Sequence, residues 1–222
     1  MKPTRGFTLV EVLVALLVLA LMAGMAWQGV DGIARARSAS QAQLEQTLRL
    51  NTVLAQWEKD LDHVQETGAV PALAFDGATL RLTRRTDEGV QVVAWTLRPD
   101  NAGTAWLRWA GPITTTSSAL QDSWIQSQQL VGTEPAQLRT LAGLTSWQVY
   151  YFVGNAWSNA QSTGDTTATT STVTGMATPT PPAAAASAVI QPALPSGVRI
   201  VLNFAPGSGF SGPLTRDTLM GP

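Results

Sequence analysis

The chain has 222 residues, enough for one ordinary domain with an appendage, and its formal net charge is −1. Charged residues make up 13 % of it, so composition offers neither the basic surface typical of nucleic-acid binding nor an acidic surface for cations. The lack of cysteine excludes disulfides and thiolate metal sites, and His63 is the one histidine. We therefore expect no cofactor, no metal site, no nucleic-acid partner and no enzymatic activity.

The first thirty residues combine a short basic piece with a long apolar run. The basic piece contains Lys2 and Arg5, and the run that follows to Trp27 is apolar or small except for one threonine and Glu11. At about 1.5 Å per residue this run forms a helix of about 30 Å, which matches the hydrocarbon core of a bilayer. The pattern predicts a single transmembrane helix over residues 7–30, with a short cytoplasmic N-terminus and the rest of the chain on the far side.

A cleavable secretory signal peptide is the alternative interpretation of this segment. Residues 23–26, Ala-Gly-Met-Ala, loosely match the small-residue site at which signal peptidases cut. Glu11 argues against it, because a charge costs roughly 2.5–3.5 kcal/mol at mid-membrane and less near the interface. A residue kept at such a cost usually has a function, although the helix dipole also favours a carboxylate at the helix entrance.

Residues 6–11, Gly-Phe-Thr-Leu-Val-Glu, resemble the cleavage and methylation motif of type IV pilins and type II secretion pseudopilins. The resemblance implies that a prepilin peptidase removes a leader of residues 1–6 by cutting between Gly6 and Phe7, and that Phe7 is then N-methylated. It also implies that Glu11 sets assembly and register. A buried carboxylate needs a partner, and the terminal amine of a neighbouring subunit supplies one when helices stack with an axial offset.

The helical pattern continues beyond the apolar run. Residues 31–64 contain no proline and no glycine after Gly32, and they are rich in good helix formers. An apolar stripe at helical spacing predicts an amphipathic continuation of the helix that packs on a globular head, with a coiled coil between subunits as the alternative. Gly68 and Pro71 end the pattern. The stripe consists of Leu44, Leu48, Leu54, Trp57, Leu61 and Val64.

The polar residues near the end of this helix show no spacing typical of a site. We expect Asp60, Asp62 and Glu66 to be solvated, and the acids elsewhere lack the dense oxygen-ligand spacing of a calcium loop. We expect His63 to make a favourable dipole contact at the helix C-terminus. The sequence contains no P-loop, no dinucleotide-binding glycine motif and no Gly-x-Ser-x-Gly.

The pattern changes to strands after the helix, so residues 65–222 are predicted to form a β-rich head. We expect an antiparallel sheet of about five to six strands packed on the helix, which is an α+β, pilin-like fold. The predicted strands cover residues 78–84, 90–97, 105–109, 145–153 and 198–204, with a short further one at 128–131.

Two compositional features mark the head. Tryptophans at alternating spacing predict a sheet core, with a carbohydrate- or base-stacking surface as the alternative. Residues 158–196 are Ser, Thr, Gly, Ala and Pro almost throughout, with Asp165 the only charge, which predicts a disordered low-complexity loop. The tryptophans are Trp95, Trp106, Trp109, Trp124, Trp147 and Trp157.

The whole arrangement resembles the J-type minor pseudopilin of type II secretion systems. The resemblance is carried by the N-terminal motif, by residues 57–61 (Trp-Glu-Lys-Asp-Leu), by the strand 78–84, by residues 147–152 (Trp-Gln-Val-Tyr-Tyr-Phe) and by the ending 194–202.

This resemblance implies a structural subunit at the tip of the periplasmic pseudopilus, which helps to export folded proteins. The subunit would sit in the bacterial inner membrane with its head in the periplasm. Its partners would be the I- and K-type minor pseudopilins, the major pseudopilin and the prepilin peptidase. A minor type IV pilin acting in pilus assembly, adhesion or DNA uptake is the alternative, because both systems share this N-terminus.

Overall fold

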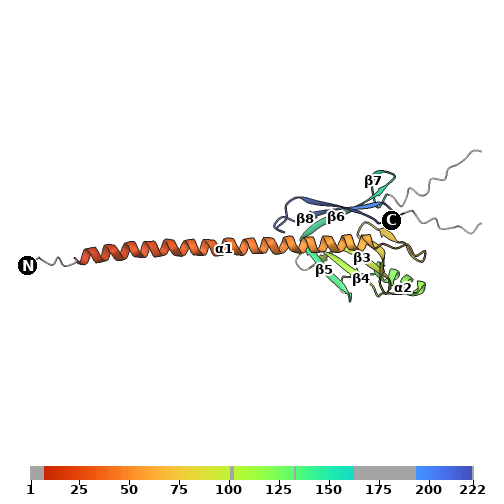
Figure 1. Cartoon of the computed structure of the whole chain (residues 1–222), viewed down its shortest axis with the longest axis horizontal. Helices are drawn as coiled ribbons and strands as arrows, with labels where there is room; N and C mark the ends of the chain where they lie inside the picture. Colours follow the sequence, from red (N-terminus) through yellow and green to blue (C-terminus); the bar gives the residue numbers. More distant parts are fainter. Residues whose placement is uncertain (1–7, 101–102, 133, 163–193, 222) are drawn as a thin grey trace, which may run out of the picture. The chain divides into compact units, whose positions relative to one another are not determined.

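The computed structural model describes residues 8–100, 103–132, 134–162 and 194–221. These residues form a long N-terminal helix followed by an antiparallel β-sheet head, which confirms the predicted α+β, pilin-like class (Figure 1). The predicted leader (residues 1–6, ending at Gly6), Phe7 and residues 163–193 of the predicted loop lie outside the described residues. Two compact units, residues 1–48 and residues 49–222, are described separately below.

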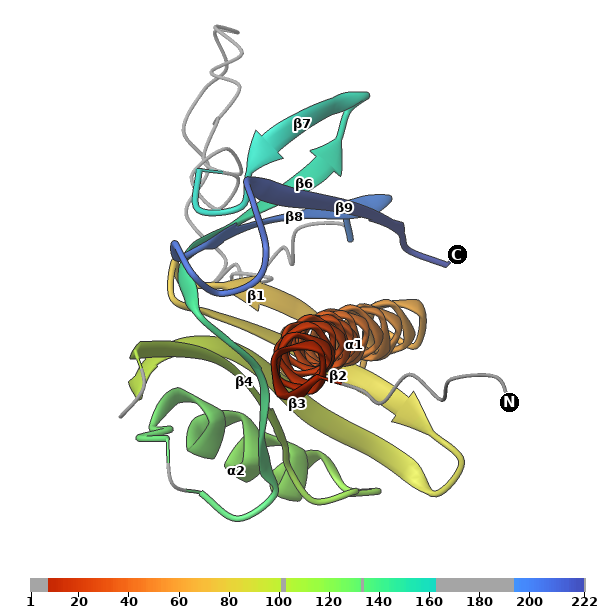
Figure 2. The same cartoon turned by 90° about the vertical axis from the view of Figure 1, so that its left-hand side faces the viewer.

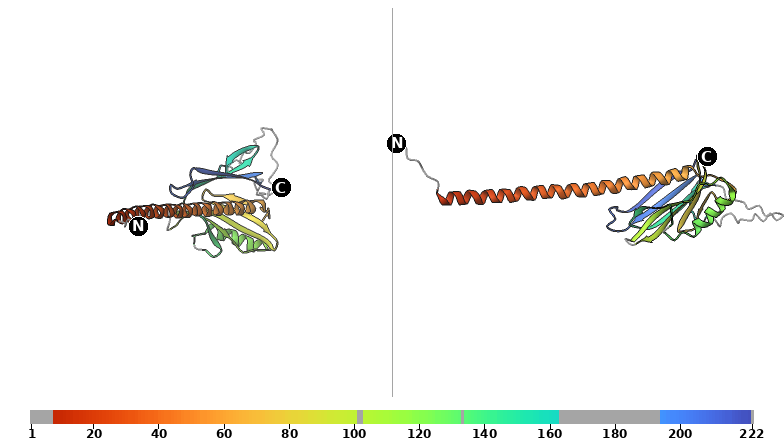
Figure 3. Two further views of the ribbon diagram at one scale, coloured as in Figure 1. Left: turned by 60° about the vertical axis from the view of Figure 1, so that its left-hand side comes forward. Right: turned by 90° about the horizontal axis from the view of Figure 1, so that it is seen from below.

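Helix α1 spans Leu9–Asp62, close to the predicted range of about 7–64 (Figure 1, Figure 3). Thr8 precedes it and acts as a cap, because its side-chain oxygen accepts the backbone N–H of Glu11 at 3.4 Å. At the other end, Nδ1 of His63 lies 2.9 Å from the carbonyl oxygen of Lys59, which is the predicted contact at the helix C-terminus. The glycines near its middle do not interrupt the helix.

The described part of the head contains two antiparallel sheets, so the prediction of a single sheet of five to six strands is wrong. One sheet has five strands in the order β1-β2-β3-β4-β5, and the other has four in the order β7-β6-β8-β9. The first comprises β1 (Leu73–Phe75), β2 (Thr79–Thr86), β3 (Gly89–Asp100), β4 (Gly103–Ala110) and β5 (Gln137–Ala142). The second comprises β6 (Leu144–Val153), β7 (Ala156–Asn159), β8 (Gly197–Phe204) and β9 (Pro213–Leu219).

Residues 128–131 form no strand, so this prediction is wrong: helix α2 (Ser117–Gln128) ends at the first of them, and residues 129–131 lie outside any helix or strand. The side chain of Thr116 caps its N-terminus by accepting the N–H of Ala119. The buried residues of α2 are spaced by three, one and three positions, so they lie on one face of the helix. Leu130, just after the helix, belongs to the same hydrophobic cluster as Leu120 and Trp124. The buried positions of α2 are Leu120, Ser123, Trp124 and Ser127.

The end of α1 packs between the two sheets, and α2 covers the outer face of the five-stranded sheet (Figure 2). The predicted stripe is buried at Leu54, Trp57 and Leu61, whereas Leu44 and Leu48 are exposed. The Trp57 ring centroid lies 5.4–6.2 Å from three other tryptophan rings, one of them from the second sheet. These three rings belong to Trp95, Trp106 and Trp147.

The prediction of a tryptophan-rich sheet core is confirmed for Trp95, Trp106, Trp109 and Trp147, whereas Trp124 is buried on helix α2 and not in a strand. Trp95, Trp106, Trp109, Trp124 and Trp147 are buried. Trp157 is half-buried and carries the Arg199 guanidinium 4.2 Å from its ring centroid.

Asp60 corrects the prediction of a solvated acid, because its side chain is fully buried. Its two carboxylate oxygens accept hydrogen bonds from Arg84 (2.6 Å), from Arg108 (2.7 and 2.9 Å), from the Trp95 indole (3.0 Å) and from Gln56 (2.9 Å). A buried carboxylate persists only with such partners. Asp60 lies three residues after Trp57 and so shares the buried side of α1, whereas Asp62 and Glu66 are exposed as predicted.

Asp76 makes a smaller charged cluster at the turn between β1 and β2. Burial alone would raise the pKa of Asp76, but the hydrogen bonds from Arg81 and from the N–H groups of Ala78 and Thr79 hold it below its usual value. Arg81 also donates to the carbonyl oxygen of Ser127 at the end of α2, so the turn, the sheet and this helix are joined.

Asp60→Asn is expected to lower the free energy of unfolding by about 3–5 kcal/mol, because two nearly buried guanidinium groups lose their anion. The unfolding transition of the full chain in detergent, followed by the fluorescence of the buried tryptophans, measures the loss. Asp62→Asn is the matched control, since this exposed carboxylate lies two residues away, and a change within about 0.5 kcal/mol is expected there. Equal effects of the two substitutions would contradict the account of Asp60.

The head is expected to lose stability as the pH falls below about 4, partly through Asp76. Its folded-state pKa is lowered, so its contribution is present above the pKa of the unfolded chain and disappears as the carboxylate is protonated in the folded state. Asp76→Asn should therefore be less stable than the parent at pH 7, with a smaller difference at pH 3. Denaturant titrations at both pH values measure this, and the exposed Asp87→Asn is the control. A difference that grows on acidification would refute it.

Candidate functional site

The first half of α1 exposes a continuous apolar surface. Side chains from Leu9 to Ile33 are exposed all round the helix, among them Leu9 at 76 % and Trp27 at 75 %. Contiguous apolar surface on this scale marks contact with a membrane or with other proteins. By length and composition α1 is able to cross a membrane, and none of its most apolar stretch is buried in the structure.

Charges limit this apolar stretch at both ends. Glu11 lies in the first turn of α1, and the next charged residue is Asp31, which forms an ion pair with Arg35 one turn later at 2.9 Å. The uncharged helix from Val12 to Val30 has 19 residues and a length of about 28 Å, close to the ~30 Å of a bilayer core. Glu11 therefore sits where the helix enters the apolar layer.

The carboxylate of Glu11 has no ion-pair partner within residues 8–100, 103–132, 134–162 and 194–221. Its backbone N–H donates to the Thr8 side chain, and its side chain is exposed. The partial positive charge at the helix N-terminus favours an acid here by only about 0.3–1 kcal/mol. In an apolar environment this carboxylate needs a cation from outside the described residues.

The other predicted site residues, Gly6 and Phe7, lie outside the described residues. Cleavage between them and methylation of Phe7 therefore stay predictions. The sequence numbering alone makes Glu11 the fifth residue of a chain that begins at Phe7. Within the described residues no group of three His, Cys, Asp or Glu side chains is arranged to hold a metal ion.

Residues 1–27 match the family model of the prokaryotic N-terminal methylation motif. The match covers Gly6, Phe7 and Glu11 and the first part of α1, and it indicates a type IV pilin-like protein, the class that includes pilins and pseudopilins. The motif implies processing by a prepilin peptidase and assembly with other pilin-like subunits. No curated protein matches the chain.

Sequence reasoning missed the buried charges around Asp60. The sequence did contain a pattern that could have revealed them. Arg84 lies on the same face of its strand as the buried Leu80 and Leu82, and Arg108 lies on the same face as the buried Trp106. Two arginines at inward positions require a buried anion, and the helix stripe offers Asp60.

Proposed function

We propose that the protein is a minor pseudopilin of a type II secretion system, a structural subunit at the tip of the pseudopilus and not an enzyme. A single observation carries the proposal: one carboxylate, Glu11, stands at the entrance of an exposed apolar helix that matches the N-terminal methylation motif. The resemblance of the head to J-type pseudopilins supports the more specific assignment, with I- and K-type pseudopilins and the major pseudopilin as partners.

The assembly step follows from electrostatics. The prepilin peptidase cuts between Gly6 and Phe7, and Phe7 is N-methylated, which leaves a positively charged terminal amine. The subunit stays in the bacterial inner membrane with its head in the periplasm. When two subunits stack, the amine of one meets Glu11 of the other. In an apolar layer an unpaired charge is costly, so the pair selects one axial register between subunits.

A minor type IV pilin remains the competing member of the same class, since the motif at residues 1–27 is shared. Co-isolation of the full chain from its own membranes separates the two. A secretion assembly predicts other minor pseudopilins and a secretion ATPase among the bound proteins, whereas a pilus predicts pilus-motor components.

Glu11→Gln is expected to insert and be processed normally but to enter filaments about tenfold less efficiently or worse. The amide keeps the shape and loses the charge, so the neighbour's amine stays unpaired. Quantitative blotting of the sheared filament fraction against the membrane fraction measures incorporation.

Val12→Ala is the matched control for Glu11→Gln, because it alters the next residue of the same helix without changing a charge. We expect it to assemble like the parent. Parent-level incorporation of Glu11→Gln would overturn the role given to Glu11, and loss of membrane insertion would show that the carboxylate acts earlier than assembly.

A further inference from the structure

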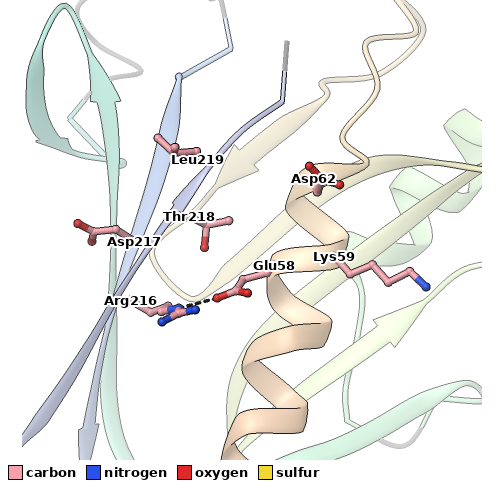
Figure 4. A pocket seen from close by; sticks show the side chains of 7 residues that line it. All are labelled: Glu58, Lys59, Asp62, Arg216, Asp217, Thr218 and Leu219. Carbon is pink, nitrogen blue, oxygen red and sulfur yellow. Dashed lines mark hydrogen bonds and ion pairs between the residues drawn. The ribbon is translucent and has the colours of Figure 1, made fainter.

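A pocket of about 480 Å³ lies between the last two turns of α1 and strand β9 (Figure 4). Glu58, Lys59 and Asp62 line it on the helix side, and residues 216–219 line it on the strand side. Successive side chains of a strand point to opposite faces. A pocket that touches four consecutive strand residues therefore lies along the edge of β9, and we name it the edge groove.

Within the described residues the backbone of β9 has no strand partner on the side of the edge groove. Among the described strands β9 pairs only with β8, at the end of the four-stranded sheet. The N–H of Met220 donates to the carbonyl oxygen of Ser196 at 3.0 Å, and bonded and non-bonded positions alternate in an antiparallel pair. The N–H and C=O groups of Thr218 thus point to β8, and those of Asp217 and Leu219 point away from it. Such an edge is a template for a further strand.

Thr218 and Leu219 are the two ends of the range of exposure along this edge of β9. Its side chain is 8 % exposed, and its Oγ1 has no hydrogen-bond partner within the part of the chain that the structure describes. It lines the edge groove and lies in the space between β9 and α1 (Figure 4). Buried hydroxyls usually have a partner. A strand laid beside β9 would cover the side chain of Leu219, which is 84 % exposed.

Two of the carboxylates around the edge groove are already neutralised. Glu58 accepts a hydrogen bond from Arg216 at 2.5 Å (Figure 4). Asp217 pairs with Arg199 through two hydrogen bonds of 2.6 Å, and the hydrogen bond from this arginine holds the pKa of Asp217 below its usual value. Neither pair leaves a net charge for a ligand.

Asp62 is the carboxylate that remains. It is 68 % exposed at the C-terminal end of α1, and its ion contact is Nδ1 of His63 at 3.7 Å. The helix dipole adds partial negative charge at this end. The ammonium group of Lys59 lies on the side of the helix away from β9 (Figure 4). Lys59 also lines the edge groove, so the charge of Asp62 is unmatched only on the side of the groove that faces β9.

We propose that the edge groove binds an extended, basic segment of a neighbouring pilin-like subunit, which adds to β9 as a further strand and places a lysine or arginine beside Asp62. The identity of the partner rests on the proposed function. The preference for an extended strand rests on the outward-pointing backbone groups of Asp217 and Leu219, and the preference for a basic segment rests on the charge of Asp62.

The test is a titration of the full chain, in detergent micelles, into a fluorescent eight-residue peptide of alternating lysine and threonine. Fluorescence anisotropy should report saturable binding, and the peptide with glutamate in place of lysine should bind more weakly. Asp62→Asn should weaken the lysine peptide about two- to fivefold. Asp122→Asn, which removes an exposed carboxylate on α2, is the matched control and should leave binding unchanged.

Leu219→Pro tests the strand edge itself. It removes the N–H that faces the edge groove without touching a bond to β8, and an edge strand tolerates proline. Binding should fall about fivefold. Leu219→Ala keeps the N–H and loses only the side-chain contact with the added strand, so it should weaken binding less than Leu219→Pro does. Tryptophan fluorescence reports whether each variant is folded, and Asp62→Asn tests the proposal separately if Leu219→Pro is not.

The proposal would be overturned if the basic and acidic peptides bound equally well. It would also be overturned if Leu219→Pro and Asp62→Asn bound the lysine peptide as tightly as the parent does. Self-association of the chain that Leu219→Pro abolishes would assign the groove to a second copy and would overturn it as well. The titration requires no filament, whereas the Glu11→Gln experiment measures filament assembly and leaves the edge groove intact. A negative result in one experiment is therefore distinguishable from a negative result in the other.

Discussion

The buried carboxylate of Asp60 is the interaction on which the head depends. It lies on α1 and binds Arg84 from β2, Trp95 from β3 and Arg108 from β4, so one side chain fixes the helix against three strands of a sheet. The apolar core around it is not directional, whereas these hydrogen bonds permit one rotation of the helix. The tryptophan cluster then fills the space between the helix and both sheets.

Helix α1 therefore carries two carboxylates in apolar positions, and the difference between them supports the proposed function. Asp60 has its cations within the head. Glu11 has none among the described residues, and the apolar side chains that follow it are exposed. The Glu11 carboxylate needs a cation and the exposed apolar side chains need an apolar environment. A membrane would supply the apolar environment first, and neighbouring subunits would supply both later. The N-terminal methylation motif indicates the same class of protein.

Sequence reasoning predicted the strands that have a neighbouring strand on both edges. The five strands predicted from alternation or apolar runs became β2, β3, β4, β6 and β8, all of them interior to their sheets. The four missed strands, β1, β5, β7 and β9, are the sheet edges, which bury less and show weaker patterns. Glu11 was found because its motif is local, whereas the Asp60 cluster joins residues far apart in the chain, and an acid in a run of charges looks solvated.

The most direct test of the account is the N-terminus of the mature protein. The full chain is produced together with its prepilin peptidase, isolated from membranes and analysed by intact-mass and peptide mass spectrometry. The account predicts a chain that begins with N-methylated Phe7 and retains Glu11. A chain that still begins at Met1, or one cut after Ala26 as a secretory signal peptide would be, would contradict it.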